Sequence, residues 1–352
     1  MAIRLIQIGL GGWGQNWFRD VVSQSKVAEV VAWVEIDAQA LADAQQRLNL
    51  PSNRCFLNLD EALATVQADA VLITASLPGH MPAARAALLA GKHVLVEKPF
   101  APTLAEASEL VKLAEQCQRI VMVSQNYRFG PAVRSARELV RQQILGPVSS
   151  VEIDFRRSAN TVPVTNHRHY QLWHPLLVDM AIHHFDLMRF ILGQEPCQVT
   201  CKTWNPPWSN FVEPPAASLT ITFDGGTIVN YRGSWISQGP MTNWSGDWHM
   251  DCEGGQIAWT GRGELPDKVL LRATGKRLRA VKLPAVEFLD RQGSLQAFTQ
   301  AVESGEVPES SGQDNLKTLA LMFAAIESAE SGLPVTISDP AVPATQHTRS
   351  GY

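Results

Sequence analysis

The sequence lacks several features that mark particular classes of protein. Its 352 residues carry 30 Lys and Arg against 34 Asp and Glu, a net charge of −4. No basic excess therefore points to nucleic acid or to an anionic membrane. No apolar run reaches the 18 residues of a membrane span. The N-terminus lacks a signal-peptide layout, since a strand pattern begins at Ile3, and we expect a cytoplasmic protein.

Cysteine is also scarce, and the chain contains no internal repeat. The five cysteines are scattered and odd in number, which indicates reduced, mostly buried thiols rather than a disulfide framework. Cys197 and Cys201 lie in one predicted strand, and nothing nearby completes a metal site. We therefore expect no bound metal.

The composition that is present indicates a large, well-packed globular protein. Hydrophobic residues make up 45% of the chain and charged residues 18%. A length of 352 residues favours two domains. We expect a dinucleotide-binding domain over residues 1–124 and a substrate-binding and oligomerisation domain over 125–338. Residues 339–352 look like a disordered tail.

A glycine fingerprint follows the first strand pattern. Gly9, Gly11 and Gly14 stand in the G-x-G-x-x-G register, and a helical pattern follows. In a dinucleotide site the first glycine makes the tight turn, the second admits the diphosphate, and the third packs helix on strand. Glu35, 21 residues after Gly14, ends a second apolar run and can accept hydrogen bonds from ribose hydroxyls. The segment predicts a dinucleotide site.

Glu35 also indicates which dinucleotide is used. A carboxylate at this position would repel a 2′-phosphate, and the following Ile36 and Asp37 supply no cation. We therefore expect NAD(H) rather than NADP(H). The alternative is that Glu35 is an ordinary solvated strand end.

The first half alternates short apolar runs with helical stretches. The runs IRLIQIG, VVAWV, AVLIT, HVLVE and IVMVS are typical of buried parallel strands. This pattern predicts a doubly wound α/β Rossmann sheet, whose ligand crevice lies at the carboxyl ends of its strands. The helices between the strands are expected over residues 37–48, 60–66, 80–90 and 103–117.

The second half has a different rhythm, typical of an α+β domain with a large, mainly antiparallel open sheet. Long helices are expected over residues 132–143, 175–192, 287–303 and 313–331, and the last of these could pack back on the first domain. Strands are expected over residues 148–155, 198–203, 218–223, 227–234, 248–253, 256–259, 269–273 and 278–283.

An open sheet must cover its second face, and six of the ten tryptophans lie within residues 204–259 of this half. Tryptophan is favoured at interfaces, although core packing explains most of these residues equally well. We expect a homodimer or homotetramer formed through the C-terminal sheet. The six are Trp204, Trp208, Trp235, Trp244, Trp248 and Trp259.

Two signals supply candidate chemistry. Lys98 directly follows the strand HVLV, at the mouth of the predicted crevice, where an ammonium can stabilise charge on a substrate oxygen. The alternative is a surface lysine. Asp179, His183 and Asp186 are spaced for one face of an apolar helix. His183 is a natural proton acceptor that Asp179 could orient or keep charged.

Neighbouring features leave other interpretations open. A single buried histidine is more often satisfied by core partners, and a zinc site lacks a third neutral ligand or an H-E-x-x-H pattern. His184 points about 100° away from His183 on a helix. It is expected to pack, or to make a second substrate contact.

The chain resembles the Gfo/Idh/MocA oxidoreductases, which include glucose–fructose oxidoreductase and inositol 2-dehydrogenase. The resemblance rests on GLGGWG, AGKHVLVEKPF, NYRF and DMAIHHFDLMRFILG in this order, and it covers nearly the whole chain. It implies NAD(P)-dependent oxidation or reduction of a sugar, polyol or related carbonyl compound. By position, Lys98 is the catalytic lysine, Asp179 its acidic partner, and His183 the general acid/base. Glu97 and Asn126 border the nicotinamide.

The sequence departs from this family at two places. Trp173-His174-Pro175-Leu176-Leu177 replaces a glycine-rich segment, and Thr74-Ala75-Ser76 replaces the usual Thr-Pro. Inositol or glucose specificity therefore does not follow. The expected cofactor contacts are Gly9, Gly11, Gly12, Trp13, Gly14, Glu35, Ala75, Ser76, His80, Glu97, Lys98 and Asn126.

Substrate recognition is expected from Asn126, Arg128 and Tyr170, together with Lys98, Asp179 and His183. The loop containing Arg156, Arg157, His167, Arg168 and His169 could favour an acidic substrate such as a uronate or a phosphorylated sugar. The alternative is a solvated basic loop. Two other functions remain open: a non-catalytic NAD(H)-binding sensor on the same scaffold, or a reductase of a non-sugar carbonyl compound.

Overall fold

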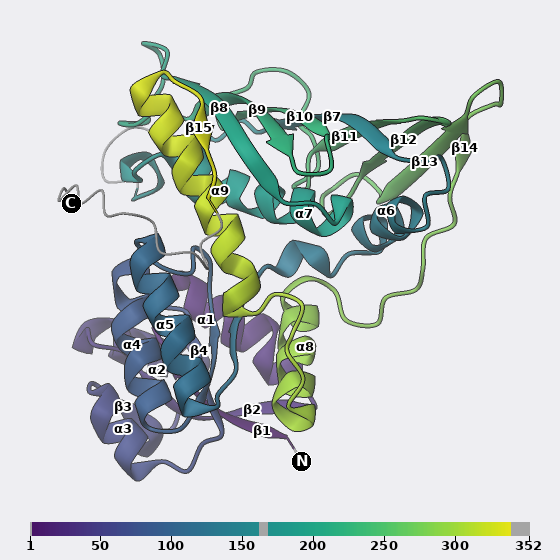
Figure 1. Cartoon of the computed structure of the whole chain (residues 1–352). Coiled ribbons are helices and arrows are strands. Elements are labelled where there is room, and N and C mark those ends of the chain that lie inside the picture. Colours follow the sequence, from purple (N-terminus) through teal and green to yellow (C-terminus); the bar gives the residue numbers. More distant parts are fainter. Residues whose placement is uncertain (1, 162–167, 339–352) are drawn as a thin grey trace.

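A computed structural model describes residues 2–161 and 168–338 of the chain. The expected disorder of residues 339–352 and the candidate His167 fall outside the described residues. The described part contains two β-sheets, one in each half of the sequence (Figure 1). The predicted division at residue 124 stays a prediction, because helices late in the chain contact both halves.

The first half forms a six-stranded parallel sheet in the order β3-β2-β1-β4-β5-β6. This is the strand order of a doubly wound dinucleotide-binding sheet. Strands β4 and β5 are buried along almost their whole length, as expected for parallel strands covered on both faces. The strands are β1 (Ile3–Ile8), β2 (Ala28–Val34), β3 (Cys55–Phe56), β4 (Ala70–Ile73), β5 (His93–Val96) and β6 (Val121–Val123).

Helices cover both faces of this sheet. Val71 and Ile73 pack with α3 (Leu59–Thr65), α4 (Leu77–Leu89) and α5 (Leu104–Cys117). Leu72, on the opposite face, belongs to the core that also holds α1 (Gly12–Asp20) and α2 (Ala38–Leu48). Strand alternation explains this division, because successive side chains point to opposite faces.

A helix from the end of the chain completes the second core. Leu295 and Phe298 of α8 (Asp290–Ser304) join Leu5, Leu72 and Leu95 in it. Figure 1 shows α8 alongside the first half, although its residues follow the second sheet in sequence. The sequence predicted a helix here but not its place in the fold.

The second half forms a nine-stranded mixed sheet in the order β14-β13-β12-β11-β7-β10-β9-β8-β15. Only β7 and β10 are parallel neighbours, so the predicted mainly antiparallel sheet is confirmed. The strands are β7 (Val148–Arg156), β8 (Pro196–Trp204), β9 (Ala216–Phe223), β10 (Ile228–Ser234), β11 (Asp247–Cys252), β12 (Gly255–Thr260), β13 (Lys268–Ala273), β14 (Arg279–Ala280) and β15 (Val335–Thr336).

Helices α6 (Pro131–Arg141), α7 (Ile182–Leu192) and α9 (Gly312–Ser331) lie against one face of this sheet (Figure 1). Helix α9 also contacts α5 and β6 of the first half. The expected helix over 175–192 differs in its first part, because residues Leu176–Ala181 form a π-helix. This wider turn shifts Asp179 relative to the i, i+4 geometry assumed from the sequence.

The opposite face of the second sheet is polar rather than rich in tryptophan. Arg232 pairs with Asp154 across neighbouring strands at 2.7 Å, and Asn230 donates to Glu152 at 2.8 Å. Trp235, Trp248 and Trp259 are buried in the core, whereas Trp204 and Trp208 are exposed. Core packing therefore accounts for at least half of the tryptophans that suggested an interface.

Three further features concern only the described residues. All five cysteines are free thiols there. No helix is both long enough and apolar enough to cross a membrane. No group of three or more His, Cys, Asp or Glu side chains is arranged to hold a metal ion.

The close packing of Gly14 makes a testable prediction about folding. A Cβ at Gly14 would lie 2.0 Å from the Gly9 carbonyl oxygen, whereas one at Gly12 would meet nothing within 4 Å. Gly14→Ala should therefore lower the free energy of unfolding by about 3 kcal/mol or more through overpacking. Gly12→Ala, the matched control, should change it by less than about 1 kcal/mol. Denaturant unfolding measures both, and equal stabilities would contradict the packing role of Gly14.

Candidate active site

The glycine loop after β1 has the three geometries that a dinucleotide site requires. Gly9 has φ +91°, and a Cβ there would lie 2.4 Å from the Ala75 backbone nitrogen. Gly14 packs α1 directly against the loop. A Cβ at Gly11 would meet nothing within 4 Å, so open space lies beside this residue. The tight turn, the open cradle and the helix–strand contact thus fall on the three glycines in the expected order.

The start of α1 and the end of β2 fit the remaining parts of a dinucleotide. Gly11 caps α1 without a side-chain hydrogen bond, so the first backbone N–H groups are available to an anion. The Glu35 carboxylate accepts hydrogen bonds from Leu10 N at 2.7 Å and Asp37 N at 3.2 Å. These bonds hold Glu35 beside the loop, where ribose hydroxyls would bind. The residues present therefore fit the expected cofactor.

His80 connects the loops at the ends of β4 and β5. Its Nδ1 lies 2.9 Å from the Pro99 carbonyl oxygen and its Nε2 lies 3.1 Å from that of Ala75. Burial lowers the pKa of His80, which favours the neutral ring. Thr74 also donates to the Gly9 carbonyl oxygen at 2.7 Å, and Ser76 is exposed at this edge. The predicted cofactor residues of β4 therefore border the glycine loop.

Glu97 lies buried beneath the same edge. Trp17 Nε1 donates to its Oε1 at 2.6 Å, and the Lys98 backbone N–H donates to its Oε2 at 3.2 Å. Burial raises the pKa of Glu97 against the opposing effect of the Lys98 charge. Trp13 is partly exposed at the loop, and the Arg291 guanidinium of α8 lies 4.5 Å from its ring centre. Helix α8 thus also contributes to the wall of this edge.

Lys98 and Asp179 meet across the two halves. Lys98 Nζ donates to Asp179 Oδ1 at 2.8 Å and to the Asp179 backbone oxygen at 2.7 Å. His169 Nε2 lies 3.5 Å from Asp179 Oδ2. Burial alone would raise the pKa of Asp179, but Lys98 and His169 outweigh it, and the net shift is downward. Asp179 is therefore a carboxylate that fixes the Lys98 ammonium.

His183 lies in a stack of three side chains. Its ring lies parallel to the Tyr127 ring, with centroids 4.1 Å apart. The Arg262 guanidinium carbon lies 4.0 Å from the same Tyr127 centroid. Two groups at this distance cannot share one face of a ring, so Tyr127 lies between His183 and Arg262. Stacking on Tyr127, rather than a hydrogen bond to Asp179, orients the imidazole, which corrects the expectation from sequence.

The environment of His183 keeps its ring neutral. Burial, followed by the charges of Lys98 and Arg262, lowers the pKa of His183 well below its ordinary value, and the opposing effect of Asp179 is smaller. Its Nδ1 is buried without a hydrogen-bond partner among the described residues. Unlike Nδ1, Nε2 is not fully buried, and it too has no hydrogen-bond partner among the described residues. A neutral ring can accept a proton at such a nitrogen.

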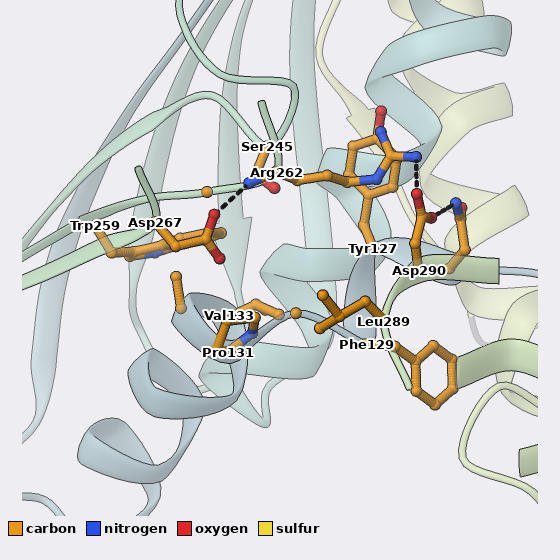
Figure 2. A pocket seen from close by; sticks show the side chains of 14 residues that line it. Tyr127, Phe129, Pro131, Val133, Ser245, Trp259, Arg262, Asp267, Leu289 and Asp290 are labelled. Carbon is orange, nitrogen blue, oxygen red and sulfur yellow. Dashed lines mark hydrogen bonds and ion pairs between the residues drawn. The ribbon is translucent and has the colours of Figure 1, made fainter. Parts of the chain in front are cut away.

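Tyr127, Arg262 and Asp290 also line a pocket beside the site (Figure 2). Arg262 Nη2 donates to Asp290 Oδ2 at 2.6 Å, and Asn126 Nδ2 donates to Asp290 Oδ1. Figure 2 shows Arg262 reaching across Tyr127 toward Asp290 at the start of α8. Lys98, Asp179 and His183 do not line this pocket. The pocket therefore lies on the Arg262 side of Tyr127, away from the three candidate catalytic groups.

The structure gives Arg128 partners other than a substrate. Its side chain is 3% exposed, and its Nε and Nη2 donate to the two oxygens of Asp186 at 2.6 Å each. Nη2 also donates to Asp314 Oδ2 at 2.6 Å, and Nη1 donates to the Glu309 backbone oxygen. The substrate contact expected from sequence is therefore replaced by an ion-pair network that holds α7 and α9 together. Asp186 belongs to this network and not to the His183 site.

Two other expectations concern packing. Tyr170 is fully buried and donates through its hydroxyl to the Ala159 carbonyl oxygen at 2.9 Å, which favours a role in packing over the expected substrate contact. His184 has both ring nitrogens close to protein partners, Tyr231 Oη at 3.0 Å and the Trp244 carbonyl oxygen at 2.9 Å. Burial lowers the pKa of His184 to about 4. The packing alternative for His184 thus fits its surroundings.

Sequence reasoning missed Tyr127 and Arg262 as neighbours of His183. Tyr127 lies between Asn126 and Arg128, in the NYRF segment that carried the family resemblance, so a local signal existed. Arg262 follows β12, and its sequence neighbours give no sign of its contact with Tyr127.

Comparison with known proteins agrees with this geometry. Residues 3–125 match a family described as an oxidoreductase family with an NAD-binding Rossmann fold. Residues 133–258 match the Gfo/Idh/MocA C-terminal domain. The chain belongs to the Gfo/Idh/MocA oxidoreductase family. The Gfo/Idh/MocA resemblance predicted from sequence, with its enzymatic character and NAD-binding fold, is therefore confirmed.

Two of the individual relatives are distant but match over nearly their whole length. The uncharacterized protein y4oX of Sinorhizobium fredii is 28% identical, over 96% of this chain and 97% of its own length. The D-apiose dehydrogenase of Paraburkholderia graminis is 25% identical, over 98% of this chain and 92% of its own. An oxidoreductase from Agrobacterium radiobacter, solved with NAD⁺, L-tartaric acid and magnesium, superposes with a TM-score of 0.83. The two sequences are 22% identical, and the superposition covers 96% of this chain and 99% of the other.

The Arg128 network predicts a large effect on stability. Arg128→Met would leave Asp186 buried without its bidentate partner, and we expect the free energy of unfolding to fall by about 3–5 kcal/mol. Arg141→Met is the matched control, since its ion pair with Glu138 is solvent-exposed and should contribute little. Denaturant unfolding compares the two. Similar stabilities for both variants would show that the network does not hold the helices.

Proposed function

We propose that this protein is an NAD-dependent oxidoreductase that transfers a hydride between nicotinamide and the CH–OH carbon of a sugar, polyol or related carbonyl compound. The observation that carries the proposal is the ion pair between Lys98, which follows β5, and Asp179, which precedes His183 by one turn in the second half. The charge of Lys98 acts on the pKa of both groups, so the three lie in one electrostatic environment.

The cofactor would lie along the carboxyl edge of the first sheet. The α1 N-terminus at Gly11 and Gly12 would receive the diphosphate, and Glu35 the adenosine ribose. Trp13, Ala75, Ser76 and His80 would border the loop, and Glu97, Lys98 and Asn126 the nicotinamide end. A carboxylate at the ribose site favours NAD over NADP, because it would repel a 2′-phosphate. When bound, nicotinamide supplies the hydride acceptor or donor.

In the oxidation direction, Lys98 would bind the reacting hydroxyl oxygen and stabilise its developing negative charge. His183 would accept the hydroxyl proton at Nε2, the ring nitrogen that is not fully buried. Tyr127 would keep the imidazole plane fixed while this proton moves. In the reverse direction His183 would return the proton to the carbonyl oxygen, while Lys98 would stabilise the charge on that oxygen.

Asp179 would act on Lys98 rather than on the proton. Its carboxylate and its backbone oxygen both accept hydrogen bonds from Lys98 Nζ, which leaves one N–H of the ammonium for a substrate oxygen. The lowered pKa of Asp179 keeps this carboxylate charged. Proton transfer would thus fall to His183, charge stabilisation to Lys98, and the positioning of Lys98 to Asp179.

The first functional prediction tests these roles directly. Lys98→Ala and His183→Ala should each lower turnover by a factor of about 10³ or more, while binding of NADH persists. Lys112→Ala, at an exposed position of α5, is the matched control and should retain full turnover. NADH absorbance reports turnover with a panel of aldoses, ketoses, polyols and uronates, and NADH fluorescence reports binding.

Near wild-type turnover in both active-site variants would show that the roles are wrong. NADH binding without turnover of any compound across a broad panel would instead favour the sensor that the sequence left open.

We also propose a homodimer or homotetramer formed through the exposed face of the second sheet, in a reducing compartment such as the cytoplasm. The free cysteines support the compartment, and the exposed Trp204 and Trp208 support an interface. The mass of the full chain measured by light scattering should be two or four times that of one chain. A monomer at micromolar concentration would contradict this assembly.

A further inference from the structure

Arg157 is a buried arginine whose Nε/Nη2 edge has no partner among the described residues. It directly follows β7, and its side chain is only 7% exposed. Its Nε and Nη2 are buried and have no hydrogen-bond partner among the described residues. Among the described residues it forms an ion pair with Glu264, which lies 3.8 Å from Nη1 and has a side chain that is 78% exposed. Glu264 therefore does not fill the Nε/Nη2 edge.

The same edge is filled in six bidentate ion pairs among the described residues, whereas a seventh, between Arg134 and Glu309, uses Nη1 and Nη2. In each of the six, Nε and Nη2 of an arginine donate to the two oxygens of one carboxylate. The arginines are Arg4, Arg19, Arg128, Arg141, Arg189 and Arg232. Two parallel N–H groups match a planar carboxylate. Arg157 has this arrangement in a buried place, without the carboxylate.

Leaving such an edge unfilled is unfavourable. A buried donor without an acceptor is destabilising, and more so when the group is charged. Arginine does not escape this cost by losing its proton. The plane of Arg157 is fixed by Trp244, whose ring centre lies 4.0 Å from the guanidinium carbon. The group is therefore held rigid, as a ligand-binding group is, rather than free to turn toward solvent.

A chain of side-chain contacts connects Arg157 to the candidate catalytic groups. Trp244, on which Arg157 stacks, contacts Trp235 at 6.1 Å between ring centres, and Trp235 contacts His169 at 4.9 Å. His169 in turn lies 3.5 Å from Asp179. Packed rings thus link Asp179 to Arg157.

The electrostatics of Tyr127 also connect Arg157 with the candidate catalytic groups. The charges of Arg157 and Arg262 both act on Tyr127, the residue stacked on His183. Arg262 is paired with Asp290 and Lys98 with Asp179, so each of these charges is balanced by a carboxylate. Arg157 supplies the cation that no nearby buried carboxylate balances.

We infer that Arg157 binds a carboxylate of the substrate, so that the enzyme acts on a sugar acid rather than on a neutral sugar. The inference rests on the proposed function, because it places the carboxylate in the substrate whose CH–OH carbon reacts beside Lys98 and His183. The carboxylate would receive two parallel hydrogen bonds from Nε and Nη2. The acidic-substrate alternative drawn from the sequence thus narrows to one arginine of the five basic residues in that loop.

The test compares neutral and acidic members of matched pairs, D-glucose with D-glucuronate and D-galactose with D-galacturonate. In the wild type, kcat/KM with NAD⁺ should be at least tenfold higher for the acid of a pair. Arg157→Gln should lower kcat/KM for the acid by about 100-fold and change that for the neutral sugar less than threefold. Arg157→Lys, which keeps the charge but not the paired N–H groups, should lose about tenfold.

Arg156→Gln is the matched control. Arg156 is the neighbouring arginine, but it is partly exposed and pairs with Asp154 at 3.2 Å. Arg156→Gln should leave kcat/KM unchanged for both members of each pair of sugars. Thermal unfolding of each variant shows whether it folds. Equal losses for acid and neutral sugars in the Arg157 variants, or a wild type that prefers the neutral members, would overturn the inference.

Binding separates this inference from the proposed function. Calorimetric titration of each uronate into the NADH-saturated enzyme should show binding that Arg157→Gln removes. If neutral sugars are oxidised but uronates neither bind nor react, the oxidoreductase proposal stands and the carboxylate site falls. If uronates bind through Arg157 but no compound is oxidised, the carboxylate site stands and the proposed reaction falls.

Discussion

The ion pair between Lys98 and Asp179 is the contact on which the rest of the site depends. It connects the end of a buried strand in the first half to the π-helical turn before α7 in the second. Because the ammonium donates to both the carboxylate and the backbone oxygen of Asp179, it fixes the position of that turn. The helix that follows carries His183, so one contact sets the relation between the glycine loop and the imidazole.

The site combines charged and neutral groups that would not coexist in water in the same way. Asp179 stays ionised because Lys98 outweighs the effect of burial on its pKa. His183 stays neutral because burial and two nearby cations act in the same direction on its pKa. Both pKa values are lowered, so the carboxylate is charged and the imidazole is neutral, as in sites that separate an electrostatic group from a proton acceptor.

The buried arginines of the second half explain how this arrangement is held. Arg128 and Arg189 share Asp314, and Arg128 also binds Asp186, so α7 and α9 are locked to the NYRF segment. Arg262 joins Tyr127 to Asp290 at the start of α8. Each of these guanidinium groups meets a carboxylate of the chain itself. Arg157 differs, because its ion pair is with the exposed Glu264, 3.8 Å from Nη1, and leaves its Nε/Nη2 edge unfilled, which is the basis for proposing a substrate carboxylate.

The local sequence determined much of the first half and part of the site. The glycine register, the buried strand runs and the position of Lys98 at a strand end are encoded within a few residues, so periodicity and spacing predict them. The resemblance to the Gfo/Idh/MocA family added Asp179 and His183 as partners of Lys98. The strand boundaries were predicted less well: β3 and β15, each two residues long, were not foreseen, and the strand expected over 278–283 is only Arg279–Ala280.

Only the tertiary structure decided which side chains meet. Three arrangements join distant segments. They are the stack of His183, Tyr127 and Arg262, the ion pairs that Arg128 makes in place of the expected substrate contact, and the packing of α8 on the first sheet. No local pattern encodes such pairings, because each depends on how two separately formed surfaces pack. The π-helical turn that carries Asp179 has the same origin, since a helical pattern in the sequence does not distinguish a 3.6-residue turn from a wider one.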